Sequence, residues 1–347
     1  MFQRILVPLD GTEGAEHAIP VAARIARATG GTIVFIRVVM APADRGTYAA
    51  GAHGTIAAKP EAEASNKELA DAASSLVATT AAHAGDLAGI QTETDVASGA
   101  TSSTIFSAAR YEHVDLIVMC SHGNTGLKRW VLGSVAHEAV RHSPVPVLVL
   151  HEHGKTLPVP DAAHPLRVLV PLDGSALSES ALKPVAQLLV ALAAPAQGEV
   201  HLLCVVDLPP AYGHMKSQAH ISDGMQEEAR KEAQTYVKAV ADRLHATPFA
   251  ETFKLNVTSS VAVSTDVAGT ITRLAEPAGD AERSAGYELI AMATHGHGGL
   301  RHLALGSVTE RVLDASKLPL LVVRPKEPGE TIQVEVTEVE IQTWPGL

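Results

Sequence analysis

The chain carries the same domain-sized pattern twice, and this internal duplication limits its fold more than any other feature. RILVPLDG at 4–11 returns as RVLVPLDG at 167–174, and residues 116–150 align with residues 289–323 without a gap. The period is about half of the 347-residue chain, which is too long for a solenoid repeat and fits two copies of one domain. We therefore predict a first domain at 1–151, a linker at 152–165, a second domain at 166–326 and a tail at 327–347.

Each copy alternates short apolar runs with stretches of helical period. Crossovers of this length predict right-handed βαβ units and a five-stranded parallel sheet with helices on both faces, which is an α/β fold of the Rossmann-like type. Aromatic residues make up only 3% of the chain, so the cores must be built from Val, Leu, Ile and Ala. In the first copy we expect strands at 4–8, 31–39, 91–98, 114–119 and 144–150, and helices at 13–29, 60–85, 101–113 and 134–142.

Each copy also contains one long amphipathic stretch, at 60–85 and at 222–244. Apolar residues recur there three or four positions apart, which predicts helices that bury one face. The predicted buried stripes are Leu69, Ala72, Ala73, Leu76 and Val77 in the first copy, and Met225, Ala229, Tyr236, Val237, Val240 and Leu244 in the second.

The composition excludes several classes of function. A net charge of −11 argues against nucleic-acid or anionic-membrane partners. The two cysteines, Cys120 and Cys204, lie far apart and offer no disulfide framework or CxxC metal site. The first residues, MFQRILVPLDG, do not read as a signal peptide, and no apolar run approaches the roughly 20 residues that span a bilayer. We therefore expect a cytoplasmic protein.

A glycine-rich loop follows the fourth predicted strand of each copy and ends in Gly-Ser. It reads HGNTGLKRWVLGS at 122–134 and HGHGGLRHLALGS at 295–307. Ligands of doubly wound sheets sit beyond the carboxyl ends of the strands, and a helix capped by Ser134 or Ser307 would present N–H groups to phosphate there. A glycine turn followed by a serine N-cap is also a common way to join a strand to a helix in proteins that bind no ligand there. The residues alone leave both interpretations open, because the spacing matches no established phosphate motif.

Taken together, ILVPLDG, VDLIVM with the CSHG after it, and the closing Gly-Ser resemble the universal stress protein family in its tandem two-domain form, over residues 1–326. The family's nucleotide-binding branch binds ATP through a G-x2-G-x9-G-[ST] signature. The resemblance therefore implies an adenine nucleotide ligand, ATP, with Mg²⁺ as its companion. It also implies an intrachain pseudo-dimer in which the last strands, PVPVLVL and LPLLVVRP, pair. Further assembly into a homodimer stays open.

Site residues follow from the resemblance, position by position. The early aspartates, Asp10 and Asp173, are implied to face adenine, and Val38 and Val205 to present backbone to it. The full implied nucleotide-binding set is Pro8, Asp10, Val38, Gly99, Met119, His122, Gly123, Gly133, Ser134 and Val135 in the first domain, and Asp173, Val205, Met292, Gly296, Gly306, Ser307 and Val308 in the second.

Both copies depart from the family signature. Its first glycine is Cys120 in one copy and Ala293 in the other, where a positive φ would be strained. Gly99 of the first copy corresponds in the sequence to Asp266 of the second, whose carboxylate would repel a polyphosphate. We therefore expect the first domain to bind ATP more readily than the second.

The leading functional hypothesis is an ATP-binding stress-response protein in which the nucleotide acts as a conformational switch. The alternatives are a nucleotide-free interaction or chaperone-like module of the same fold, and a slow ATP hydrolase. No catalytic residue is assigned, because no Ser–His–Asp arrangement is defensible. Cys120 is interpreted as a packing residue, and the histidines as lacking the partners of a metal site. The tail is interpreted either as an added edge strand or as an acidic flexible segment.

Overall fold

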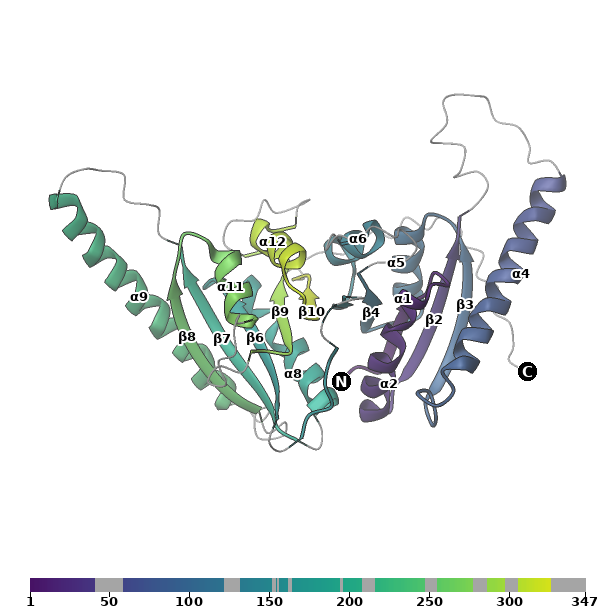
Figure 1. Cartoon of the computed structure of the whole chain (residues 1–347), viewed down its shortest axis with the longest axis horizontal. Helices are drawn as coiled ribbons and strands as arrows, with labels where there is room; N and C mark the ends of the chain where they lie inside the picture. Colours follow the sequence, from purple (N-terminus) through teal and green to yellow (C-terminus); the bar gives the residue numbers. More distant parts are fainter. Residues whose placement is uncertain are drawn as a thin grey trace, which may run out of the picture. The chain divides into compact units, whose positions relative to one another are not determined.

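The structure, a computed structural model, divides the chain into two compact units, Met1–Glu152 and His153–Pro325, called the first and the second unit below (Figure 1). The side chains of residues 59–65 and 216–223 lie outside its description. The residues that it describes are 1–40, 59–121, 132–151, 154, 156–161, 164–193, 196–207, 216–246, 255–276, 286–296 and 305–325.

The sheet strands of the first unit run parallel in the order β3-β2-β1-β4-β5. The order reverses between β1 and β4, so a topological switch point lies at the carboxyl ends of these two strands. The strands span Arg4–Pro8 (β1), Thr32–Val39 (β2), Gln91–Ser98 (β3), Leu116–Cys120 (β4) and Val147–Leu150 (β5).

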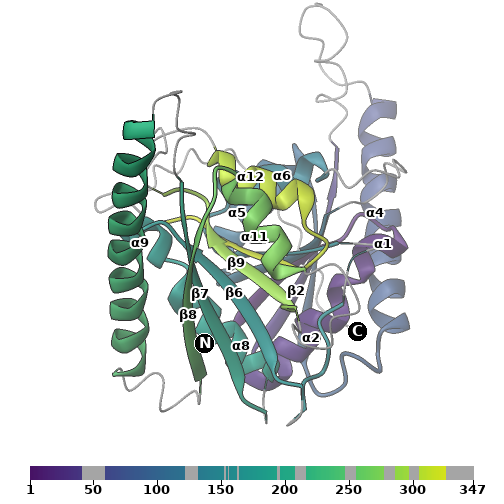
Figure 2. The same ribbon diagram turned by 60° about the vertical axis from the view of Figure 1, so that its left-hand side comes forward.

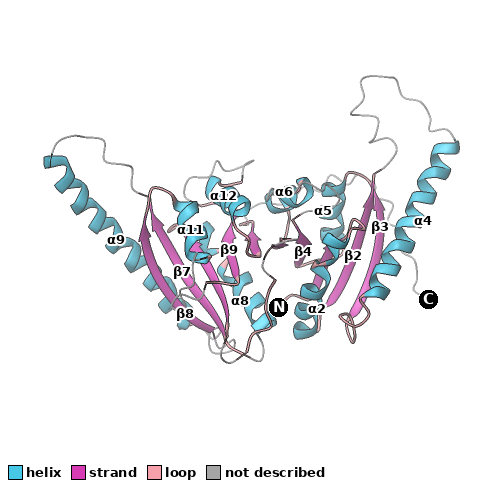
Figure 3. Ribbon diagram, in the orientation of Figure 1, coloured by secondary structure: helices cyan, strands magenta, loops and turns pink. Residues whose placement is uncertain are grey.

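The second unit repeats this sheet, with parallel strands in the order β10-β9-β6-β7-β8 (Figure 3). Its switch point lies between β6 and β9. The strands span Leu166–Leu172 (β6), Gly198–Val206 (β7), Leu255–Val263 (β8), Leu289–Ala293 (β9) and Leu320–Val323 (β10). The predicted pair of five-stranded parallel sheets is therefore confirmed.

Helices cover both faces of each sheet, as right-handed crossovers require. In the second unit α11 and α12 lie in front of the sheet and α8 behind it (Figure 2). The helices of the first unit span Glu13–Glu16 (α1), Ala18–Thr29 (α2), Lys59–Ala82 (α4), Thr101–Tyr111 (α5) and Ser134–His142 (α6). Those of the second span Ala176–Glu179 (α7), Leu182–Ala193 (α8), Lys216–His245 (α9), Val267–Ala275 (α11) and Ser307–Ala315 (α12).

The core is aliphatic, as the composition predicts. Every residue of β4 is buried, and so is every residue of β9. One described stretch, Ala176–Ala193, is long and apolar enough to cross a membrane by length and composition, but half of it is buried in the structure. It consists of α7 and α8, and α8 packs on β6 and β7.

The helices differ from the sequence expectations in three details. The helix predicted at 13–29 is interrupted at His17, where α1 ends and α2 begins. The α9 helix starts at Lys216, before the predicted residue 222. Val77 is 58% exposed although its neighbour Leu76 is buried, and Met225 is 64% exposed because residues 224–228 of α9 are all exposed. The tail at 327–347 lies outside the described residues, and the pairing of the last strands stays a prediction.

Candidate functional site

A cavity of about 380 Å³ opens in the second unit at the carboxyl ends of β6, β7 and β9. Its volume falls within the range of roughly 300–1,000 Å³ that is usual for small-molecule sites. It lies at the switch point of the sheet, where ligands of such folds bind. All of the site residues predicted for the second domain line it together, namely Asp173, Val205, Met292, Gly296, Gly306, Ser307 and Val308.

One wall of the cavity is apolar. Leu203 and Val205 lie two residues apart on β7 and therefore point to the same face of the sheet. Val267 and Ile271 lie four residues apart on α11 and share one side of that helix. Of these four residues only Val205 was predicted. The spacing of the others was visible in the sequence, but no motif marks them as cavity residues.

The other wall comes from the described residues at the two ends of the segment between β9 and α12. The Gly306 N–H donates a hydrogen bond to the Thr294 carbonyl oxygen at 2.9 Å. A Cβ atom on residue 306 would lie 2.8 Å from that same oxygen, so the close approach requires glycine. The Thr309 hydroxyl donates to the Ala293 carbonyl oxygen at 3.0 Å. These bonds hold the beginning of α12 against the end of β9.

Gly133 and Gly306, rather than the serines that follow them, are the N-caps of α6 and α12. The prediction that Ser134 and Ser307 cap these helices is therefore wrong by one residue, and each serine is the first helical residue. Neither N-cap makes a side-chain hydrogen bond, because glycine has no side chain. The first N–H groups of α12 thus meet the cavity at Ser307 and Val308, where the helix dipole favours an anion.

Asp173 is fixed by the turn that follows β6. Its Oδ1 accepts hydrogen bonds from the Ser175 N–H at 3.0 Å and from the Ser175 hydroxyl at 2.6 Å. The Ser175 Oγ in turn accepts from the Ser178 N–H at 3.1 Å, which caps α7. The Asp173 carboxylate therefore enters the cavity in a set orientation, with Oδ2 against Gly296.

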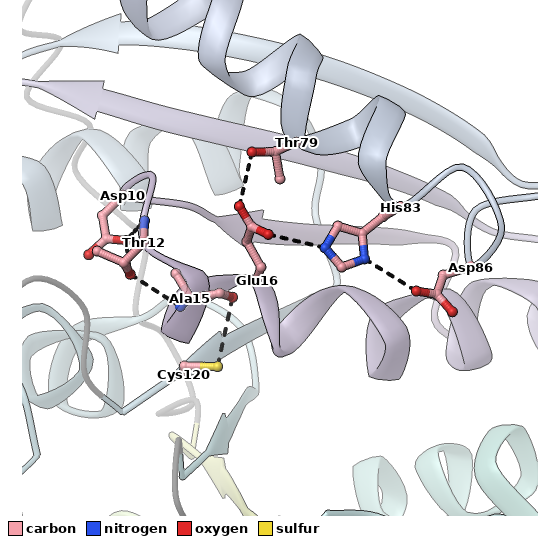
Figure 4. Close-up of polar contacts among 8 residues, drawn as sticks. All are labelled: Asp10, Thr12, Ala15, Glu16, Thr79, His83, Asp86 and Cys120. Carbon is pink, nitrogen blue, oxygen red and sulfur yellow. Dashed lines mark hydrogen bonds and ion pairs between the residues drawn. The ribbon is translucent and has the colours of Figure 1, made fainter.

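The first unit builds the same turn after β1 (Figure 4). The Asp10 Oδ1 accepts from the Thr12 N–H at 3.0 Å and from its hydroxyl at 2.6 Å, and the Thr12 Oγ accepts from the Ala15 N–H at 3.3 Å. Val38 and Val205 also occupy equivalent places in their sheets. Val38 lies two residues beyond the β2 residue that pairs with Pro8, and Val205 lies two residues beyond the β7 residue that pairs with Pro171. His122 and Gly123 lie outside the described residues.

The sequence profile of the Universal stress protein family matches residues 1–151 and 166–324, which together make up most of the chain. The chain belongs to the universal stress protein family. A universal stress protein of Mycobacterium tuberculosis is 30% identical over 213 residues, which are 60% of this chain and 62% of that relative. The match thus spans less than two thirds of the relative's length.

Two solved structures share the fold of the whole chain. A functionally unknown protein from Pseudomonas aeruginosa has a TM-score of 0.55 at 15% identity, and the match covers 93% of each chain. A universal stress protein from Archaeoglobus fulgidus has a TM-score of 0.54 at 18% identity, with 93% of this chain and 97% of that one covered. At these identities the likeness concerns the tandem fold alone.

The departures from the universal stress protein signature at Cys120 and Ala293 cause no backbone strain. Both residues end a strand, and among the described non-glycine residues only His113 has a positive φ, at 52°. The Cys120 thiol is buried and donates to the Ala15 carbonyl oxygen at 3.8 Å (Figure 4). Both small side chains therefore stand in ordinary strand backbone, which does not require glycine.

The predicted match between Gly99 and Asp266 is wrong. Gly99 and Ser264 each donate their N–H at 3.0 Å to the last residue of the neighbouring strand, β2 or β7, so Ser264 is the counterpart. Gly99 has a φ of 149°, and a Cβ there would lie 2.7 Å from the Thr104 hydroxyl oxygen. The second unit has one more residue between the strand end and the helix, which displaced the alignment.

Asp266 is the N-cap of α11, and its charge has two partners. Its Oδ1 accepts from the Gly269 N–H at 3.1 Å and from an Arg311 Nη at 2.7 Å. The hydrogen bond from Gly269, followed by the one from Arg311, holds the pKa of the Asp266 carboxyl below its usual value. The expected repulsion of a polyphosphate is therefore offset by a cation on the neighbouring helix.

Proposed function

We propose that the cavity of the second unit binds an adenine nucleotide, ATP in particular, and that the bound nucleotide acts as a conformational switch in a stress response. The observation that carries this proposal is one cavity in which the family's motif residues meet an apolar wall and a helix N-terminus whose N-cap makes no side-chain hydrogen bond. An adenine nucleotide needs both surfaces, because its base is flat and weakly polar while its phosphates are anionic.

Each part of the cavity suits one part of the ligand. Leu203 and Val205 on β7, facing Val267 on α11, offer an apolar slot for the base. The Asp173 carboxylate is a hydrogen-bond acceptor in the cavity wall, and it suits an N–H or hydroxyl of the nucleoside. The first N–H groups of α12, which begin at Ser307, suit the phosphates. The negative charge of Asp173 disfavours the reverse orientation of the ligand.

Mg²⁺ fits this site only together with the nucleotide. Asp173 is the one carboxylate among the lining residues, and the described part of the chain holds no group of three His, Cys, Asp or Glu residues that could bind a metal. Because the Asp173 carboxylate is assigned to the nucleoside, Mg²⁺ would be held here by the phosphates and by the waters that this ion usually keeps. The ion would supply neutralisation of the phosphate charge.

A nucleotide that binds only the folded state stabilises it by mass action, by about 2.7 kcal/mol when its concentration is 100 times the dissociation constant. The proposed switch requires in addition that the nucleotide binds one folded conformation more tightly than another. For the first unit, ATP binding through Asp10, Val38 and Gly99 stays a prediction, and so does the expectation that it binds ATP more readily than the second unit. The pseudo-dimer and the cytoplasmic location also stay predictions.

The decisive experiment is to denature the purified protein, identify any released nucleotide by chromatography, and titrate the emptied protein with ATP by calorimetry. We expect Gly296→Ala to weaken binding, since the new Cβ would displace Asp173, and we expect the control Gly224→Ala to leave it unchanged, since nothing lies within 4 Å of that position.

Failure to release any nucleotide, together with no shift in melting temperature in millimolar ATP, would overturn the proposal and favour the nucleotide-free module. Accumulation of ADP at a rate that Gly296→Ala abolishes would instead identify a slow hydrolase.

A further inference from the structure

We propose that Arg311 is a specificity residue of the second unit: by pairing with Asp266 it allows the cavity to accept a polyphosphate rather than a bare nucleoside. This inference rests on the proposed nucleotide function of the same cavity. It assigns a role to a side chain outside the motif residues that the family resemblance implied.

The ion pair is next to lining residues of the cavity in the sequence, although neither of its members lines the cavity itself. Asp266 directly precedes Val267, a lining residue, and Arg311 lies one turn of α12 beyond Ser307, another lining residue. Their 2.7 Å contact joins the beginning of α11 to the first turns of α12. Arg311 and Asp266 side chains are 61% and 46% exposed, so the pair itself adds little to stability. We nevertheless expect its charges to act on a ligand that binds at the α12 N-terminus.

The two charges have opposite effects on a phosphate chain. Alone, Asp266 would place a negative charge near the helix end that is suited to phosphate. Coulomb interactions at a protein rim fall with distance and are screened beyond about 8 Å at physiological salt. Because Arg311 binds the same carboxylate oxygen that caps α11, it cancels this field at short range. The repulsion that returns without Arg311 should grow with each phosphate on the ligand.

The first unit has neither member of the pair. Ala100 is the N-cap of α5, the place that Asp266 takes in α11, and Glu138 stands where α12 has Arg311, four residues after the first helical serine. The acidic cap and its cation therefore occur together in the second unit and are both absent at the matching places in the first. This joint occurrence is what charge compensation predicts.

The test uses the full chain and a readout local to the second unit. Hydrogen–deuterium exchange of peptides covering 286–296 and 305–315 is titrated with adenosine, AMP, ADP and ATP at low salt. The variants are Arg311→Gln, Asp266→Asn and the double variant, with Arg230→Gln as the matched control. Arg230 is also an arginine paired with a carboxylate, at 3.7 Å from Glu227 and 59% exposed, but it lies on α9.

We expect Arg311→Gln to weaken ATP binding by about five- to tenfold, ADP binding less, and adenosine binding by less than twofold. The double variant should return ATP binding to within about twofold of the original protein. In 1 M salt, the difference in ATP binding between Arg311→Gln and the original protein should disappear. Arg230→Gln should match the original protein for every ligand.

Equal loss for adenosine and ATP in Arg311→Gln would overturn the inference, because it would mean that the pair only holds α11 against α12. Loss of ATP binding that the double variant does not restore would also overturn it, since Arg311 would then contact the phosphates directly. Absence of protection by any ligand in the original protein would overturn the proposed function itself and this inference with it.

Discussion

Gly296 lies directly against the carboxylate of Asp173: a Cβ atom on residue 296 would be 1.7 Å from the Asp173 Oδ2. One residue comes from the loop after β9 and the other from the loop after β6, which are the two strands that flank the switch point. The glycine of the motif is therefore explained by a neighbouring side chain, before any ligand is considered. The contact also makes the two positions interdependent.

We expect Gly296→Ala to lower the free energy of unfolding by about 1–3 kcal/mol, since the added methyl group forces Asp173 out of its bonds to Ser175. Adding Asp173→Ala should recover part of that loss, because it removes the obstructing carboxylate. Urea unfolding of the two single variants and the double variant measures this coupling. Additive effects of the two substitutions would show that the contact does not limit residue 296.

Acid should weaken the second unit through His201. Its ring nitrogens lie 2.8 Å from the Thr258 hydroxyl and 2.7 Å from the Ser260 hydroxyl. Burial, followed by the charge of Arg167, lowers the pKa of His201 from its usual 6.5. Below pH 6.5 His201 becomes protonated in the unfolded chain before it does so in the folded one. The contribution of neutral His201 to the free energy of unfolding is therefore fully present above pH 6.5 and is lost as the pH falls through the lowered pKa.

The measurement is amide exchange in peptides of β7 and β8 between pH 7.5 and 5, corrected for the intrinsic pH dependence of exchange. His201→Gln should flatten the pH dependence of protection. The control His164→Gln should not, because the His164 side chain is 85% exposed. An unchanged slope in His201→Gln would assign the acid response to other groups.

Asp95 should have the opposite effect in the first unit. It is 9% exposed on β3, and burial, followed by the charges of Glu112 and Glu93, raises the pKa of its carboxyl, while Arg4 opposes the shift. A carboxyl whose folded pKa is raised stabilises the fold below its unfolded pKa and loses that contribution as the pH rises through the folded pKa.

We therefore expect Asp95→Asn to raise stability at pH 7 by about 0.5–1 kcal/mol and to have little effect near pH 3.5. Chemical unfolding at both pH values, with exchange in β3 peptides to locate the change, measures this effect. The surface substitution Asp242→Asn on α9 is the control. Destabilisation by Asp95→Asn at pH 7 would mean that the ionised carboxylate has a favourable partner.

Glu179 should contribute to stability as an anchor between α7 and α9. Its Oε1 accepts from the Tyr236 hydroxyl at 3.1 Å, and its other oxygen forms an ion pair with Arg243. Burial and the charge of Glu179 raise the pKa of Tyr236, so that hydroxyl remains a donor. In the first unit Glu16 has the same place at the end of α1 and binds α4 through Thr79 (Figure 4).

We expect Glu179→Ala to lower the free energy of unfolding by about 1–2 kcal/mol, because the Tyr236 hydroxyl loses its acceptor. Glu179→Gln should lower it by less than about 1 kcal/mol, because the amide oxygen still accepts that hydrogen bond. Thermal unfolding of both variants provides the comparison. Equal losses would assign the effect to the exposed pair with Arg243 instead.

The sequence allowed the sheet and the motif part of the cavity to be predicted, for a physical reason in each case. Buried parallel strands appear as continuous apolar runs, and Asp173 and Gly296 stand at strand ends where loops meet. The apolar wall was missed at Val267 and Ile271, because a residue that faces a cavity and one that faces the core have the same helical spacing.

Two local assignments failed because they depended on a single position. Gly133 and Ser134 are adjacent and both suit an N-cap, so only the backbone distinguishes them. Ser264 and Asp266 could not be separated without the sheet register, since the second unit has an additional residue between strand and helix. The sequence pattern therefore predicts which helix or strand a residue belongs to better than it predicts the role of a single residue at the end of that helix or strand.

The hydrogen bond from the Gly306 N–H to the Thr294 carbonyl has a consequence for engineering. It brings the two ends of the intervening segment within 2.9 Å, and the Gly133 N–H does the same with the Ser121 carbonyl at 2.7 Å. The attachment points of each segment are therefore set by the strand and the helix that it joins. We expect an insertion into either segment to lower the free energy of unfolding by roughly the cost of closing a slightly larger ring.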